Sequence, residues 1–124
     1  MTSQSPRDIN ALKRADYQRK IAKKEEEIEN LERQKKKLAD QVEAYYFDMI
    51  HSLRRSAMIY DRMAPDGGMQ NKRDAAINQE VTRRMSQSTD NLHEKIDWVY
   101  KQEKKKLSLE REALSKERSA LPWE

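Results

Sequence analysis

The chain has 124 residues, of which 39% are charged and only 6% are aromatic, and its mean hydropathy is -1.20. This composition excludes a globular domain with one thick apolar core and leaves two classes, a disordered chain or a coiled coil. The 26 basic and 22 acidic residues give a net charge of +4 and are interspersed along the chain. A nucleic-acid-binding protein usually concentrates basic residues on one face, so we expect no nucleic-acid partner.

Targeting and redox features are also restricted by composition. The sequence has no cysteine, which excludes disulfides and cysteine-based metal sites. No apolar run approaches the ~20 residues that cross a bilayer, so we expect no membrane insertion. The first six residues lack the apolar stretch of a cleavable signal peptide, and a cytoplasmic location is therefore expected.

The first expected helix runs from about residue 6 to 63. Ser5 is a suitable N-cap, Pro6 suits the first helical position and Asp8 lies in the positively polarised first turn. From Ile21 onward, apolar residues follow a heptad repeat that is typical of a coiled-coil seam. The seam residues predicted in this helix are Ile21, Ile28, Leu31, Leu38, Val42 and Met49.

A second apolar series begins within the same helix. Most of its members follow a residue of the heptad series by one position, which rotates this stripe by about 100° around the helix. A helix in a two-helix hairpin needs one stripe, so the second stripe indicates another protein neighbour or a wider hairpin seam. The predicted partner-binding residues are Tyr45, Tyr46, Ile50, Leu53, Ala57, Tyr60 and Trp98. If they bind a partner, Tyr46→Asp with Leu53→Asp should abolish the complex and leave the chain helical.

The two expected helices are separated by a turn at residues 64–68, which contains the only two glycines of the chain. Proline is excluded from helix interiors, and glycine reaches left-handed backbone angles that other residues avoid. The residues that reverse the chain are predicted to be Pro65, Asp66, Gly67 and Gly68.

The second expected helix runs from about residue 70 to 121, and Pro122 ends it. Its predicted seam residues are Met85, Leu92, Ile96, Val99, Leu107 and Leu114. In an antiparallel helix pair, the residue numbers of any two facing residues add up to nearly the same total. In this chain the total is about 134, for example for Leu38 with Ile96, so the chain should reverse near Gly67. The sequence therefore predicts an all-α, long antiparallel two-helix hairpin of coiled-coil type that forms one domain over residues 1–124.

Chemistry-bearing residues do not form a recognisable set. His51 and His93 are ten residues out of the pairing register and should not meet. A two-helix coil also has no cleft that would desolvate a pair of carboxylates, and no nucleophile, phosphate-loop or dinucleotide motif is present. We expect no metal, no cofactor, no catalytic residue and no enzymatic activity.

The C-terminal half carries Asn91-Leu92-His93-Glu94-Lys95, 101-KQEKKKL-107 and 109-LEREAL-114, and an aromatic Tyr45-Tyr46-Phe47 cluster precedes the turn. These features resemble the accessory proteins of LXG toxins of the Gram-positive type VIIb secretion system, over nearly the whole chain. The resemblance implies a targeting factor or chaperone that binds the toxin's N-terminal helical LXG domain, alongside a second small helical protein, and that is co-secreted or retained. The alternative is a stalk or chaperone hairpin of a type III or flagellar export system that engages a ring ATPase.

Overall fold

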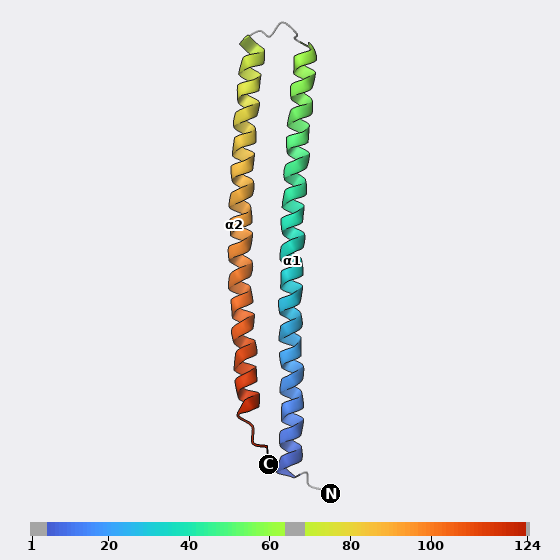
Figure 1. Cartoon of the computed structure of the whole chain (residues 1–124), viewed down its shortest axis with the longest axis vertical. Helices are drawn as coiled ribbons and strands as arrows, with labels where there is room; N and C mark the ends of the chain where they lie inside the picture. The colour runs from blue at the N-terminus through green and yellow to red at the C-terminus, as the bar shows by residue number, and fades with distance from the viewer. Residues whose placement is uncertain (1–4, 64–68, 124) are drawn as a thin grey trace. The chain divides into compact units, whose positions relative to one another are not determined.

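The computed structural model describes residues 5–63 and 69–123 of the chain. It contains two α-helices, α1 (Pro6–Met63) and α2 (Met69–Ser119), which pair in antiparallel fashion (Figure 1). The described residues include no strand, and the predicted all-α helical hairpin is confirmed. The predicted turn residues Pro65, Asp66, Gly67 and Gly68 lie outside the described part of the chain.

Both helix ends follow local rules. The backbone amide of Asp8 donates to Oγ of Ser5 at 3.3 Å, and the amide of Ile9 donates to the carbonyl of Ser5 at 3.1 Å. Ser5 is therefore the N-cap that the sequence predicted, with Pro6 as the first helical residue. At the other end α2 stops at Ser119, two residues short of the expected end, and the amide of Leu121 donates to the carbonyl of Arg118 at 3.2 Å just before Pro122.

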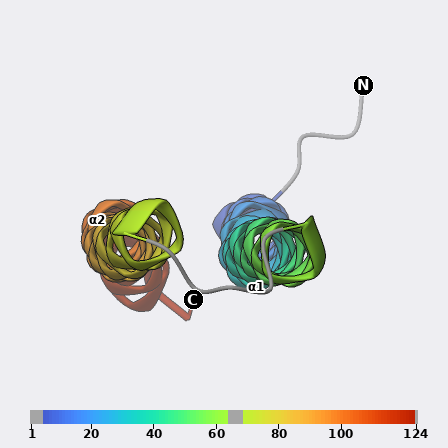
Figure 2. The ribbon, with the colours of Figure 1, turned by 90° about the horizontal axis from the view of Figure 1, so that it is seen from above.

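The chain divides into two compact units, which are described separately. The first consists of residues 1–35 and 98–124, and the second of residues 36–97. Each unit contains one segment of α1 and one segment of α2, and within each the two segments lie side by side when seen from the side and along the helices (Figures 1 and 2).

The apolar core is thin in both units. Ile21 in the first unit is 4% exposed and Ile96 in the second is 6% exposed, and these are the only buried apolar side chains among the described residues. The other residues of the interface between the helices are half-buried. Because two helices alone enclose little volume, most side chains between them keep an edge in water.

The covered face of α1 repeats at the period of a straight helix. Between residues 21 and 57, and apart from Glu27, buried or half-buried side chains occur at positions 21, 24, 28, 31, 35, 39, 42, 46, 50, 53 and 57. Their average spacing is about 3.6 residues, whereas a heptad seam has 3.5. On a straight helix a strict heptad drifts by ~20° per repeat, so four repeats accumulate ~80°, nearly the angle between neighbouring residues.

This drift corrects four of the predicted seam residues. Met49, four heptads after Ile21, is 36% exposed and lies at the edge of the covered face, whereas the next residue, Ile50, is half-buried. The same pattern occurs at Leu38, which is exposed and is followed by the half-buried Ala39. On α2, the exposed Leu92 and Val99 are likewise each followed by a half-buried residue, His93 and Tyr100. Ile28, Leu31, Val42, Met85, Leu107 and Leu114 are half-buried.

The thin core makes the two buried isoleucines disproportionately important. Ile21→Ala and Ile96→Ala should each lower the free energy of unfolding by about 2 kcal/mol or more, because each removes buried methyl groups and leaves a cavity. Ile59→Ala is the matched control, since Ile59 is half exposed and should change stability by less than ~0.5 kcal/mol. Urea unfolding followed by circular dichroism measures all three, and equal effects would contradict the assigned core.

Candidate interaction surface

Within the second unit, the predicted partner-binding residues whose side chains are described do not share one surface. Tyr46, Ile50, Leu53 and Ala57 are half-buried on the covered face of α1. Tyr45 is 68% exposed and lies one position, or about 100°, away from that face. The side chain of Tyr60 is outside the described set.

Trp98 belongs to the other unit and is 64% exposed. It follows the buried Ile96 by two positions, which is about 200° around α2, so it points away from the side of the helix that faces α1.

Burial favours the wider-seam interpretation for Tyr46, Ile50, Leu53 and Ala57. These four side chains recur at the average spacing of a straight helix and each is half-buried. Pairing of α1 with α2 requires such a row of partly covered side chains on one face. The prediction that they bind a partner stays a prediction, and the exposed residues beside them are better placed for that role.

We define the apolar flank as six large apolar side chains of the second unit that are between 36% and 68% exposed. Five of them immediately precede a half-buried residue, and the sixth, Ile59, comes two heptads after Tyr45. Three of the six were assigned by sequence to the seam itself. The members of the flank are Leu38, Tyr45, Met49 and Ile59 on α1 and Ile77 and Leu92 on α2.

The members on α1 and on α2 face the same side of the hairpin. In an antiparallel helix pair, the residue before a seam position on one helix lies on the same side as the residue before a seam position on the other. The register of the Glu43–His93 contact places Tyr45 nearly level with Leu92 and Ile59 level with Ile77. The second unit therefore presents apolar side chains of both helices on one side, with Ser52, Ser56 and Ser88 between them.

The opposite side of the same unit carries both a polar contact between the helices and two exposed apolar residues, Phe47 and Met58, the latter 59% exposed. Nε2 of His93 lies 2.7 Å from Oε1 of Glu43, a contact that links the two helices. Phe47 is 66% exposed on this side, and its ring meets that of Tyr46 edge-on with centroids 6.3 Å apart. Phe47 and Tyr45 are thus equally exposed aromatic residues on opposite sides of α1.

Ion pairs connect the helices in the first unit. Nζ of Lys24 lies 2.7 Å from Oε2 of Glu110, and this hydrogen bond raises the pKa of Lys24 and lowers that of Glu110. Nζ of Lys104 donates to Glu32 at 2.6 Å, which lowers the pKa of the Glu32 carboxyl. Glu32 lies one helical turn after the acidic run at residues 25–29.

The end of the first unit carries a separate contact. The guanidinium of Arg14 donates to the carbonyl of Pro122 at 2.8 Å and lies 4.2 Å from the centre of the Trp123 ring. Arg118 donates to the side-chain oxygen of Gln18 nearby. These contacts hold the residues that follow α2 against the beginning of α1.

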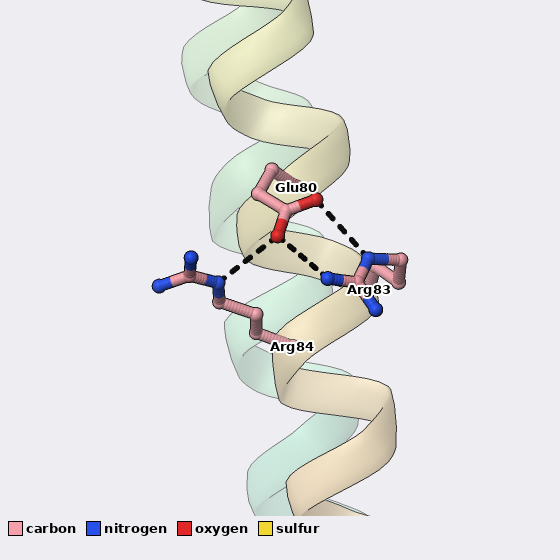
Figure 3. Close-up of polar contacts among 3 residues, drawn as sticks. All are labelled: Glu80, Arg83 and Arg84. Atoms are coloured by element: carbon pink, nitrogen blue, oxygen red, sulfur yellow. Dashed lines mark hydrogen bonds and ion pairs between the residues drawn. The ribbon is translucent and has the colours of Figure 1, made fainter.

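A local charge cluster occurs on α2 in the second unit (Figure 3). Glu80 accepts two hydrogen bonds from Arg83, at 2.7 and 3.1 Å, and one from Arg84 at 3.0 Å. These hydrogen bonds, with that to Arg83 as the larger effect, lower the pKa of Glu80 to about 2.

Within the described ranges, no three His, Asp or Glu side chains are grouped so that they could hold a metal ion. His51 is exposed, and His93 has the single contact with Glu43. A search of the described residues found no helix both long and apolar enough to traverse a bilayer.

Comparison with known proteins returned no match to this chain among family models, curated proteins or solved structures.

The apolar flank was missed in the sequence because its members complete the heptad series. The sequence feature that could have revealed it is the second apolar series, at Tyr46, Ile50, Leu53 and Ala57. Its spacing matches a straight helix of 3.6 residues per turn better than the heptad series does. The two apolar series of α1 are explained if, in the second unit, the second series packs against α2 and the heptad series stays exposed beside it.

The double substitution Tyr46→Asp with Leu53→Asp now has a different expected result. Two carboxylates placed on the covered face of α1 should weaken its pairing with α2 and reduce the helical circular dichroism signal without any partner. A double variant that remains fully helical would return these residues to the partner-binding interpretation.

The pKa of Glu80 can be tested by titration. Because its folded pKa is lowered, its contribution to stability is present above the ordinary value of 4.5 and is lost as the pH falls toward about 2. Carboxyl carbon NMR should give a titration midpoint well below 4.5, and Arg83→Gln with Arg84→Gln should raise it toward that value. High salt should do the same, since exposed pairs are screened. A midpoint near 4.5 in the unsubstituted chain would contradict the cluster.

Proposed function

We propose that the chain is a non-enzymatic targeting factor or chaperone that binds the N-terminal helical LXG domain of a type VIIb-secreted toxin and helps to deliver it to the secretion apparatus. The observation that carries the proposal is the apolar flank, with Tyr45 as its most exposed member. The resemblance of 101-KQEKKKL-107 and its neighbouring segments to LXG-associated proteins supplies the identity of the partner.

The chemistry of the flank suits a helical partner. Exposed apolar residues that form a strip bordered by polar residues mark protein interaction sites. Tyr45, Met49 and Ile59 recur at spacings compatible with a heptad, so a partner helix can insert its own side chains between them. Burial of such side chains contributes roughly 25 cal/mol per Å² of apolar area.

The described carboxylates that have shifted pKa values do not point to catalysis. Asp16, Glu32, Glu80 and Glu110 all have lowered pKa values, in each case because of hydrogen bonds to lysine or arginine. A general acid needs the opposite shift, which burial produces.

The test compares two equally exposed aromatic residues on opposite sides of α1. We expect the unsubstituted chain to co-purify with an LXG domain when the two are co-expressed, and Tyr45→Asp should weaken the complex at least tenfold by calorimetry. Phe47→Asp is the matched control and should bind as the unsubstituted chain does. Circular dichroism checks that both variants remain helical.

Two results would overturn the proposal. One is the absence of any complex between the unsubstituted chain and LXG domains. The other is binding to a hexameric export ATPase with stimulation of its ATP hydrolysis, which would favour the export-stalk alternative.

A further inference from the structure

A row of basic side chains runs along the α2 margin of the apolar flank. Arg73, Arg84 and Lys95 are exposed and are spaced by 11 residues, or three helical turns, so they lie almost in line. Arg73 precedes Ile77 by four residues and Lys95 follows Leu92 by three, which are the spacings of neighbours on one helix face. We call these three residues the basic row.

The basic row retains positive charge after its internal contacts are counted. Arg84 shares Glu80 with Arg83, so one carboxylate serves two guanidinium groups (Figure 3). No ion pair joins Arg73 or Lys95 to any residue in the described ranges. The α1 margin of the flank is mixed, because Gln41, Asp48 and Ser52 occupy it together with the exposed Arg55 and Arg62.

We propose that the apolar flank and the basic row together bind one amphipathic helix of a partner protein, whose apolar face is bordered by acidic residues on the side that meets α2. This inference rests on the proposed function and adds the charge pattern of the partner. The apolar flank would supply the binding area, and the row would fix the orientation of the bound helix.

A second copy of this chain fits the same surface less well. If α2 met α2 of the other copy, the two basic rows would face each other and repel. If α2 met α1 of the other copy, the row would find Asp48 as the only carboxylate of that margin. Neither arrangement pairs three positive charges, whereas a helix with an acidic margin does.

The experiment uses two synthetic 28-residue helical peptides with the same leucine heptad seam, one with glutamate and one with lysine at every position beside the seam. Fluorescence anisotropy with the full chain should show at least tenfold tighter binding of the glutamate peptide at low salt. The difference should shrink at high salt because these charges are exposed. Equal binding of the two peptides would overturn the proposal.

Charge-reversal variants locate the effect. Arg73→Glu with Lys95→Glu should abolish or reverse the preference for the glutamate peptide. Lys36→Glu with Lys72→Glu is the matched control, since it changes the net charge equally on the other side of the same unit, and it should keep the preference. If the control loses the preference equally, net charge is the cause and the basic row is not the site.

Two further measurements separate this inference from the proposed function. Sedimentation of the chain alone should show a monomer; a dimer that Tyr45→Asp dissociates would make a second copy the occupant and overturn the inference. Peptide discrimination without binding of any LXG domain would support the site and overturn only the toxin as partner. An LXG domain that binds equally to the Arg73→Glu/Lys95→Glu variant would overturn only the acidic margin.

Discussion

Each turn of α1 can present only one narrow face to α2, and the rest of the molecule depends on which residues occupy that face. The covered positions of α1 follow the pitch of a straight helix, about 3.6 residues per turn. The apolar residues follow two registers, and the chain cannot bury both against a single neighbour. The register that begins at Ile21 is covered there, but by Met49 it has turned away and Ile50 has taken its place. The uncovered remainder of the first register is the apolar flank.

The sequence was sufficient for the fold because the relevant signals are local and strong. Pro6 and Ser5 mark the first helix start, Pro122 marks the end of the second helix, and two stretches free of glycine and proline leave little choice but two helices. The pairing register was also close, since the Glu43–His93 contact lies within two residues of it. These features depend on residue type and spacing, which a sequence displays directly.

The candidate surface was less accessible to sequence reasoning for a physical reason. Assigning Leu38, Met49 and Leu92 to the seam assumed that the helices supercoil to follow the heptad, whereas the covered face keeps the straight-helix period. A difference of 0.1 residue per turn is negligible over one heptad and decisive over four. Tyr45 and Tyr46 exchange roles as a result, although they are adjacent in the sequence.

The contacts of Arg14 have a consequence for behaviour in acid. The cross-helix pairs of Glu32 and Glu110 require ionised carboxylates and fail once those groups take up protons. Arg14 instead donates a hydrogen bond to a backbone carbonyl and contacts the face of an aromatic ring. Neither partner titrates, and the guanidinium remains charged over the whole pH range. The residues that follow α2 should therefore keep their contacts with α1 in acidic solution after the ion pairs of Glu32 and Glu110 are lost.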